Sequence, residues 1–313
     1  MPTFDKHKLL IIGSFAAIYI IWGSTYLFAA FAMDELPPFL MAGSRYGMAG
    51  LLLLALAFLV GKNESMTQKQ LLNTLFAGVL MLGIGGGFVF WGLQFIDSGF
   101  TALVISGQPL LILFMMWGIQ GKKPHKQAYL GILLGMLGMY LLVSQKALVA
   151  NPNQWMGVSA IFVSMLSWGY GSLFLGTADM PKSKMMSSSI QMIVGGAFLL
   201  IVSGFLENPM QVNWLELQNV TYLAMIYLII FGSIIAFSAF NFLLSEVSPD
   251  KVSTSTYVNP IVAMFLGWSF RDEIITSQSM LAAAIMLTGV FFINAKPEYS
   301  QKLLRRIRMV GRR

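Results

Sequence analysis

Cysteine is absent from this sequence of 313 residues, and histidine occurs only twice. Without thiols the chain forms no disulfide and offers no thiolate ligand to a metal ion. The two histidines, His7 and His125, fall outside the apolar stretches described below. No Walker A motif occurs, which argues against an ATP-driven pump. We therefore expect no cofactor, no metal centre and no histidine-based catalytic site.

Charged residues are also scarce. They make up 11% of the chain, whereas a soluble domain carries about 25%. Hydrophobic residues account for 57% and form runs of roughly 20 residues, the length that crosses a bilayer core of about 30 Å. In a soluble chain the net charge of +7 would suggest a nucleic-acid partner. Here the sequence indicates a polytopic membrane protein, whose partner is the lipid bilayer and not a nucleic acid.

The apolar runs predict an all-α fold with ten transmembrane helices. The first run, from Leu9, is too long for the apolar core of a signal peptide and is interpreted as a retained helix. The expected helices cover residues 9–32, 39–60, 70–94, 98–120, 127–145, 155–175, 185–205, 220–244, 251–270 and 277–295.

Lysine and arginine are distributed unevenly between the two sides of the predicted bundle. With the N-terminus in the cytoplasm, 17 of the 20 lie in cytoplasmic segments. Only Lys146 and Arg271 lie on the other side, and Arg45 falls within a span. This bias predicts that both termini are cytoplasmic. The basic tail at 297–313 either fixes this orientation or binds anionic lipid headgroups.

The two halves of the chain repeat one pattern. An offset of 151 residues aligns Pro109 with Pro260, and an offset of 146 aligns Trp22 with Trp168. The same offsets pair Gln108 with Asn259, Phe114 with Phe265, Trp117 with Trp268, Gly138 with Gly289 and Gly50 with Gly196. Each copy has five spans, an odd number, so the second copy is expected to be inverted in the membrane. We predict two repeats, 1–148 and 149–296, with a binding site between them near the midplane.

An amide followed by proline occurs within a predicted helix of each repeat. Gln108 precedes Pro109, and Asn259 precedes Pro260 after a run of four hydroxyl residues at 253–256. Proline removes a backbone donor and disrupts the bond to the carbonyl four residues earlier. In a membrane such a freed carbonyl is tolerated where it faces protein or a water-filled cavity. We therefore expect helix breaks at both prolines beside a cavity; a kink that only improves packing is the alternative.

Aromatic and polar residues at matching positions extend this predicted cavity. The stretches "YIIWGSTYL" and "SMLSWGYGS" place a Trp-Gly pair and hydroxyls in the first and sixth spans, and packing is the competing interpretation. The glycines at 83–87 suit close helix packing; no strand precedes them and no basic residue completes a phosphate-binding loop. The candidate cavity residues are Trp22, Ser24, Thr25, Tyr26, Arg45, Trp91, Gln94, Gln108, Trp168, Tyr170, Asn241, Tyr257 and Asn259, with Ser172 beside them.

Arg45 is the single charged residue in the interior of a predicted span, since Lys251 stands at the first residue of the ninth. An intramembrane charge indicates function by default. Its place about seven residues from the start of the second span, roughly 10 Å deep, leaves two interpretations. Arg45 contacts a substrate or gate, or it has a structural role or extends its side chain to the headgroups.

Acidic residues avoid the middle of every predicted span. Asp97, Asp250, Asp272 and Glu273 sit at helix ends, where solvent is expected to keep them ionised. Proton-coupled carriers usually hold a carboxylate or histidine within the membrane. The sequence therefore predicts facilitated diffusion or exchange, driven by the gradient of the transported solute.

Five segments together resemble the EamA-type permeases of the drug/metabolite transporter superfamily. They are "YIIWGSTY", "PPFLMAGSRYGMAGLLLL", "SMLSWGYGS", "YLIIFGSIIAFSAFNFLL" and "VSPDKVSTSTYVNPIVAMFLG", and the resemblance covers about residues 9–295. It implies ten helices and an alternating-access carrier that commonly exports amino acids or other small metabolites. The family often ends spans four and nine with Gly-Glu. This chain departs from that pattern at Gly121-Lys122, which puts a role for an acid there in doubt.

The expected function is that of a secondary transporter in a bacterial inner membrane, exporting small amphipathic metabolites as a monomer or weak homodimer. A polar but mostly uncharged cavity suits a zwitterion or neutral solute better than a nucleotide sugar. A membrane enzyme would need a nucleophile, base or metal cluster at matched depth, and none is visible. A sensor or assembly factor is the other alternative, and no soluble domain is present to carry a signal.

Overall fold

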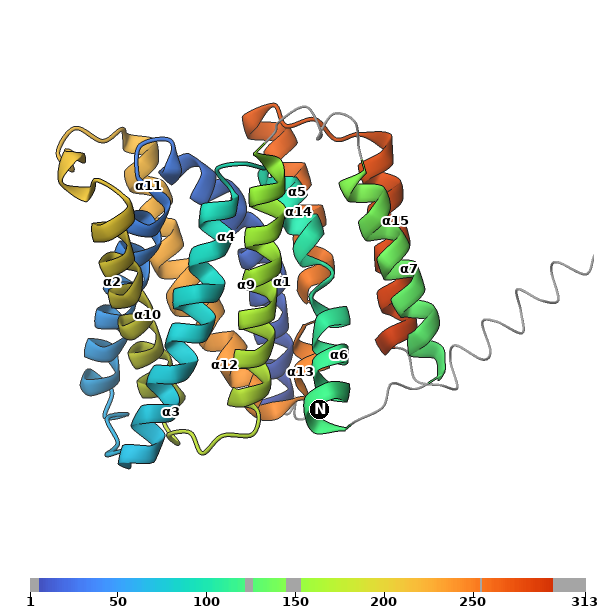
Figure 1. The fold of residues 1–313 in the computed structure, drawn as a ribbon. Helices are drawn as coiled ribbons and strands as arrows, with labels where there is room; N and C mark the ends of the chain where they lie inside the picture. The colour runs from blue at the N-terminus through green and yellow to red at the C-terminus, as the bar shows by residue number, and fades with distance from the viewer. Residues whose placement is uncertain (1–5, 122–125, 145–152, 254, 295–313) are drawn as a thin grey trace, which may run out of the picture.

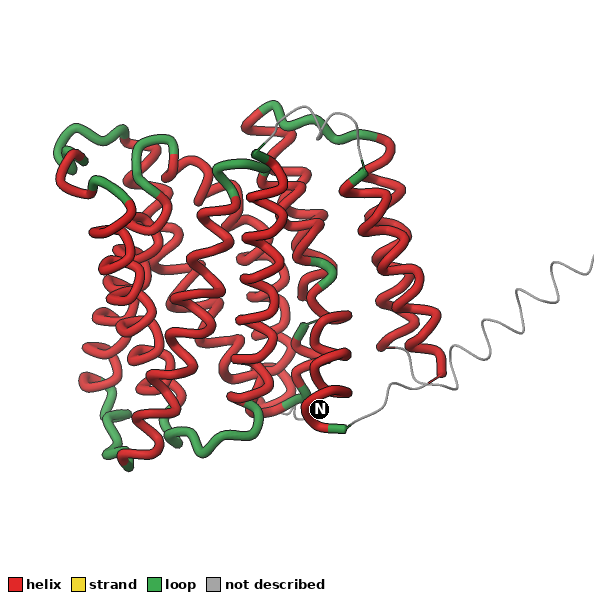
Figure 2. The backbone as a smooth tube through the Cα atoms, in the orientation of Figure 1, coloured by secondary structure: helices red, strands yellow, loops and turns green. Residues whose placement is uncertain are grey.

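The computed structural model describes residues 6–121, 126–144, 153–253 and 255–294, and their regular secondary structure is helical (Figures 1 and 2). The predicted basic tail at 297–313, the repeat boundary at 148, and His125, Lys122 and Lys146 lie outside the described residues.

The described residues of the first half form eight helical segments, of which η1 is a π-helix. They are α1 (Lys6–Met33), α2 (Pro38–Leu59), α3 (Gln68–Gly78), η1 (Val79–Gly86), α4 (Gly87–Gly92), α5 (Ser98–Ile105), α6 (Gln108–Gln120) and α7 (Lys126–Val143). The second half is built similarly, with the π-helix η3 and a short 3-10 turn η2. Its segments are α9 (Gln154–Leu175), α10 (Lys184–Leu206), η2 (Pro209–Gln211), α11 (Asn219–Tyr227), η3 (Leu228–Ile235), α12 (Ala236–Glu246), α13 (Pro249–Val252), α14 (Ser255–Arg271) and α15 (Ser277–Asn294).

Seven helical stretches in the described part of the chain are long and apolar enough to cross a membrane. They agree with the first four and the sixth to eighth predicted spans to within a few residues. Large apolar side chains such as Leu59 and Phe205 are exposed on them, at 84% each. Such side chains suit contact with lipid, because a helix satisfies its own backbone hydrogen bonds there.

Local sequence explains where several helices begin and end. Thr67 and Gln70 form a reciprocal capping box at the start of α3, which satisfies two otherwise free N–H groups. Gly61 follows α2 with φ +66°, and Lys62 N donates to Ala57 O at 2.8 Å. This is the Schellman pattern, in which glycine adopts the left-handed conformation without strain.

The third and eighth predicted spans each contain a π-helical segment at a similar place. The segments η1 and η3 begin at Val79 and Leu228 and are eight residues long. A π-helical turn disturbs the regular bonding of backbone carbonyls, and side chains from neighbouring helices bind some of those carbonyls. Ser164 Oγ on α9 donates to Gly85 O at 2.6 Å, and Trp22 Nε1 on α1 donates to Gly232 O at 3.2 Å.

The helices that contain the prolines are interrupted, but not symmetrically. Between α5 and α6 the helix breaks at 106–107, directly before Gln108 and Pro109 (Figure 2). In the second half the chain leaves α13 after Val252, and Pro260 lies inside α14. The predicted break at Pro260 is therefore wrong. Loss of one N–H leaves the rest of the helical bonds intact, so α14 continues through the proline.

Glycines bring several helix pairs into backbone contact. A Cβ added to Gly196 of α10 would lie 2.5 Å from Gly47 N of α2, and one added to Gly289 of α15 would lie 2.7 Å from Gly131 O of α7. The pair formed by α7 and α15 stands at one edge of the bundle (Figure 1). The largest buried apolar cluster lies on the other side, where α1, α2, α10 and α12 meet.

Candidate functional site

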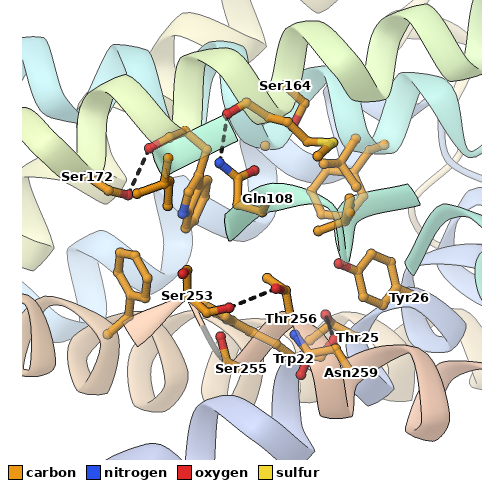
Figure 3. Close-up of a pocket in the computed structure, with 18 of the residues that line it drawn as sticks. Trp22, Thr25, Tyr26, Gln108, Ser164, Ser172, Ser253, Ser255, Thr256 and Asn259 are labelled. Carbon is orange, nitrogen blue, oxygen red and sulfur yellow. Dashed lines mark hydrogen bonds between the residues drawn. The ribbon is translucent and has the colours of Figure 1, made fainter. Parts of the chain in front are cut away.

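A cavity lies where α1, α13 and α14 approach α6 and α9. Its volume is about 120 Å³. Gln108, Ser164 and Ser172 lie across the cavity from residues of α1 and α14 (Figure 3). The lining residues are Trp22, Thr25, Tyr26, Arg45, Tyr46, Gly86, Val89, Phe90, Ile105, Gln108, Ile112, Ser164, Met165, Trp168, Ser172, Phe240, Pro249, Ser253, Ser255, Thr256 and Asn259.

Aromatic rings from three helices form one wall of the cavity. The rings of Trp22 and Trp168, which the sequence offset of 146 pairs, meet edge to face with centroids 5.6 Å apart. Phe240 of α12 lies 5.0 Å from Trp22 and 5.5 Å from Trp168. Edge-to-face contacts of this kind are favourable beyond simple burial. The structure therefore brings the two Trp-Gly motifs together at the cavity.

The two amides that precede proline each bind the opposite half of the chain. Gln108 Nε2 donates to Met165 O of α9 at 2.9 Å. With its amide nitrogen turned toward α1, Asn259 donates to Tyr19 O at 2.8 Å and to Ser255 O at 3.0 Å. Both amides line the cavity and are nearly fully buried. They connect the proline-containing helices to α9 and α1.

The glycine of each Trp-Gly pair permits this approach. A Cβ on Gly23 would lie 3.1 Å from both Asn259 Cα and Asn259 O. One on Gly169 would lie 2.9 Å from Gln108 Nε2. Because glycine has no side chain, α1 and α9 come close enough for the amides to reach the carbonyls.

Hydroxyl groups complete the polar lining. Thr25 Oγ1 donates to Trp22 O at 2.7 Å, and Thr256 Oγ1 donates to Ser253 O at 2.7 Å. Ser172 Oγ donates to Trp168 O at 2.8 Å. Each hydroxyl has used its hydrogen on a carbonyl of its own chain segment, so the oxygens face the cavity chiefly as acceptors.

Arg45 lines the cavity, and only 3% of its surface is exposed. Its Nε donates to Ser233 Oγ at 2.8 Å, and its guanidinium carbon lies 5.0 and 5.4 Å from the ring centroids of Tyr46 and Phe90. Nη1 has no hydrogen-bond partner. The Arg271–Asp34 salt bridge and the His7–Glu246 contact both lie away from Arg45.

The burial of Arg45 bears on one part of the structural interpretation, the extension of the side chain to the headgroups. A side chain this enclosed does not reach the headgroups, so that explanation is wrong. Arginine stays protonated in proteins, and a buried ion costs several kcal/mol. One hydrogen bond to a charged group returns about 1.5–3 kcal/mol, and a desolvated cation–π contact about 2 kcal/mol. The observed contacts are of the same order as that cost, yet Nη1 still lacks a hydrogen-bond partner.

Several candidate residues lie away from the cavity. Ser24 Oγ bonds Tyr227 Oη of α11 at 2.6 Å, and Tyr170 is 40% exposed on α9. Trp91 and Gln94 line a separate hollow near Glu35 and Glu207. The amide of Asn241 donates to Ser188 Oγ and Gln191 Oε1 of α10. The side chain of the last candidate, Tyr257, lies outside the described residues.

Other lining residues were not among the sequence candidates. Tyr46 follows Arg45 directly, and Ser164 lies one helical turn before Trp168, so both had a sequence signal in their neighbours. Phe90 and Phe240 stand in uniformly apolar runs. Nothing in such a run distinguishes a cavity-facing ring from one that packs or faces lipid.

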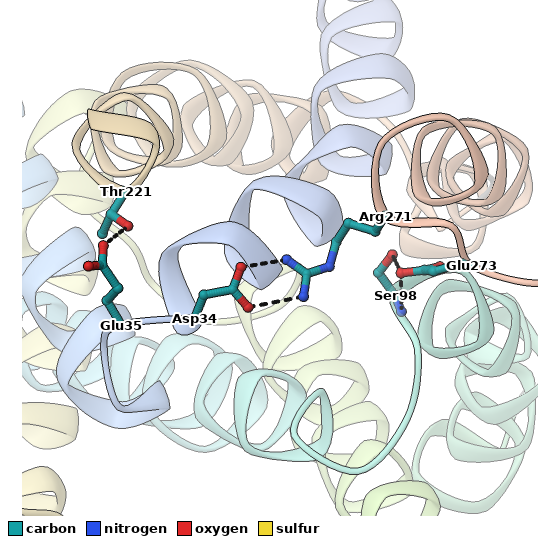
Figure 4. Close-up of polar contacts among 6 residues, drawn as sticks. All are labelled: Asp34, Glu35, Ser98, Thr221, Arg271 and Glu273. Carbon is teal, nitrogen blue, oxygen red and sulfur yellow. Dashed lines mark hydrogen bonds and ion pairs between the residues drawn. The ribbon is translucent and has the colours of Figure 1, made fainter. Parts of the chain in front are cut away.

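One end of the bundle carries polar contacts that join the two halves; we refer to it as the Arg271 end. Arg271 donates to both carboxylate oxygens of Asp34 at 2.7 and 3.0 Å (Figure 4). Glu35 accepts from Gln218 N at 2.9 Å and from the Thr221 hydroxyl. Carboxylates are favourable at helix N-termini because free N–H groups point outward there.

The other two contacts at the Arg271 end also cap helices across the halves. Glu207 accepts from Phe39 N and Leu40 N of α2 at 2.8 and 2.9 Å. Glu273 accepts from Ser98 N at 3.2 Å, from Ser98 Oγ at 2.5 Å and from Gly99 N at 3.0 Å. The carboxylate of Glu273 thus holds the start of α5, a role that the sequence did not predict.

Asp97 lies in the same group of charges. Desolvation by the surrounding helix ends and the nearby Glu273 carboxylate raise the pKa of Asp97, and Arg271 opposes the rise. The surroundings of Asp97 thus favour its protonated form more than open solvent would.

Known proteins match nearly the whole chain. The model of the EamA-like transporter family matches residues 9–144 and 155–295. The uncharacterized inner membrane transporter YedA of Escherichia coli is 34% identical over 92% of each chain. The uncharacterized transporter YoaV of Bacillus subtilis is 24% identical over 88% of this chain and 93% of its own.

More distant proteins match over a similar length. A WAT1-related chloroplastic protein of Arabidopsis thaliana is 24% identical over 88% of this chain and 67% of its own. A solved crystal structure is 18% identical and superposes with a TM-score of 0.66 over 91% of this chain and 97% of its own, which shows that the fold is shared. The two matched segments and the identity to YedA establish that this chain belongs to the EamA-like transporter family.

Proposed function

We propose that the protein is a secondary transporter of small amphipathic solutes, such as amino acids, and that the central cavity is its substrate site. The cavity supports this proposal most directly, because it lies between the two halves and combines aromatic faces with hydroxyls and amides. In alternating access, one half moves against the other around such a site. Contacts across the cavity would then change as the solute passes.

Matching contacts support an inverted repeat of five helices. The acceptors of the two amides, Tyr19 and Met165, are 146 residues apart, and the donors Asn259 and Gln108 are 151 apart. Both pairs follow the offsets found in the sequence. The π-helices η1 and η3 match as well. The segments α7, α13–α14 and α15 run alongside the seven apolar stretches (Figure 1), which would bring the spans to ten.

The structure differs at its two ends in a way that suggests a direction of loading. The cavity lining reaches Pro249 and Ser253 near Lys251. It includes no residue of the segments 34–37, 207–218 and 271–276, where the polar contacts of the Arg271 end are found. We infer a conformation that is closed at the Arg271 end and receives solute from the Lys251 end. If Lys251 faces the cytoplasm of a bacterial inner membrane, this conformation is the loading state of an exporter.

The orientation is testable because the chain has no cysteine of its own. We expect Asn213→Cys, near the Arg271 end, to react with a membrane-impermeant maleimide in intact cells. Glu64→Cys, in the loop between α2 and α3, should react only after the membrane is opened. The charge bias motivates this expectation. The reverse labelling pattern would overturn both the orientation and the assignment of the loading state.

Transport itself is tested in proteoliposomes that contain the purified full chain. Vesicles preloaded with unlabelled phenylalanine or leucine should accumulate the labelled solute by exchange, and protein-free vesicles should not. An imposed pH step without a solute gradient should drive little uptake. The described residues that line the cavity include no carboxylate that could carry a proton. Absence of exchange for both phenylalanine and leucine would contradict the transport proposal. Uphill uptake abolished by a protonophore would instead contradict the uncoupled mechanism and direct attention to Asp97.

A further inference from the structure

We propose that Arg45 binds a carboxylate on the transported solute, so that the cargo is a small carboxylate-bearing solute with an apolar or aromatic body. This inference rests on the proposed transport function and specifies the chemistry of its substrate. Arg45 is 97% enclosed, it lines the cavity, and its Nη1 has no hydrogen-bond partner. A permanently charged group with a free donor in a buried site requires an acceptor there.

The surroundings of the guanidinium favour an anion that enters from outside the chain. Ser233 Oγ accepts a hydrogen bond from Nε, and the guanidinium carbon lies over the rings of Tyr46 and Phe90. None of the described residues that line the cavity is an aspartate or glutamate. The site therefore holds one positive charge with no internal counter-ion. An incoming carboxylate would supply the missing charge and, after a small turn of the guanidinium, the acceptor for Nη1, which is enclosed in this conformation.

The rest of the lining determines what is attached to that carboxylate. Trp22, Trp168 and Phe240 form a connected aromatic surface. Such a surface favours an apolar or aromatic body. A strongly cationic solute would meet the charge of Arg45 at close range without a compensating acid. The cavity thus selects against amines that carry no carboxylate.

Four probes that share a phenyl ring test the proposal. Phenylacetate carries a carboxylate, phenylacetamide is its neutral counterpart, phenethylamine is a cation, and phenylalanine carries both charges. Binding to the purified full chain is measured by calorimetry and by the shift in unfolding temperature. In the unmodified protein we expect phenylacetate or phenylalanine to bind at least tenfold more tightly than phenylacetamide, and phenethylamine to bind most weakly. Which of the two carboxylates binds better identifies the source as a simple organic acid or an amino acid.

Two substitutions locate the carboxylate. Arg45→Gln should reduce the affinity for phenylacetate at least tenfold and leave that for phenylacetamide within about twofold. Arg45→Lys should recover only part of the loss, because lysine lacks the planar fork of donors. Lys69→Gln serves as the control, since it removes one positive charge from an exposed position at the start of α3 and should change neither affinity.

The comparison in the unmodified protein remains decisive even if neither Arg45 variant folds. Equal binding of phenylacetate and phenylacetamide would overturn the proposal, and so would binding of none of the four probes. A carboxylate preference that persists in Arg45→Gln would overturn it too, because the anion would then bind elsewhere. Exchange of neutral solutes without a carboxylate preference would leave the transport function intact and refute only this inference. Carboxylate binding at Arg45 without exchange would support this inference and contradict the transport function.

Discussion

Gly196→Ala is expected to destabilise the protein strongly, because it adds a methyl group between two helix backbones. The new Cβ would lie 2.5 Å from Gly47 N and 2.9 Å from Gly43 O. Both are backbone atoms of α2, so no side-chain rotation relieves the overlap. Helices α2 and α10 would have to separate along their shared surface. Overpacking usually costs about 1–3 kcal/mol, and we expect about 3 kcal/mol here because the contact is between backbones.

Gly204 provides a matched control on the same helix. A Cβ at this position meets nothing within 4 Å, so Gly204→Ala carries the same change in helix propensity without the overlap. That change favours alanine by about 1 kcal/mol. Unfolding of the two variants in detergent, followed by near-ultraviolet circular dichroism, should therefore separate them by several degrees. Equal midpoints would show that α2 and α10 do not pack as closely as described.

Replacement of the two buried amides should have the largest effect on transport. Gln108→Ala removes the donor to Met165 O, and Asn259→Ala removes the donors to Tyr19 O and Ser255 O. Loss of one partner of a buried hydrogen bond costs about 1–3 kcal/mol. If the bonds hold one conformation of the cycle, a change of about 1.4 kcal/mol alters a rate tenfold. We expect each substitution to slow solute exchange about tenfold and the double substitution to slow it by more than either alone.

A control amide distinguishes this effect from a general loss of stability. Gln94 is exposed and donates only to Trp91 O within its own turn, at 3.2 Å. Gln94→Ala should therefore exchange solute at the rate of the unmodified protein. Exchange rates are compared at equal amounts of folded protein, as judged by size-exclusion chromatography. Unchanged exchange in both Gln108→Ala and Asn259→Ala would mean that the amides contribute only to packing.

Composition was sufficient to predict the seven long apolar helices of the described residues. A bilayer imposes a strict length and polarity on each crossing, so apolar runs located the helices without reference to any partner. The internal offsets of 146 and 151 residues also predicted which motifs would correspond, and Trp22 and Trp168 do meet at the cavity. Short-range rules failed at Pro260, where α14 continues because the remaining backbone bonds hold the helix.

The sequence could not indicate which polar residues share a site. Trp91 and Gln94 belong to the same span as Phe90, yet they line a hollow near the Arg271 end, whereas Phe90 faces Arg45. The direction of a side chain around a helix depends on which neighbours the helix packs against, and apolar runs with no polar face do not reveal it.

Arg45 illustrates the same division most clearly. Its position in the sequence established that a charge lies within a predicted span, roughly 10 Å from the start of the second predicted helix. Only the tertiary structure showed that α2 turns this side chain inward, against Ser233 from the other half and two aromatic rings. Burial and pairing are properties of contacts between segments almost 190 residues apart in the chain. Those contacts, and with them the free donor at the cavity, are set by how the two halves pack and not by local sequence.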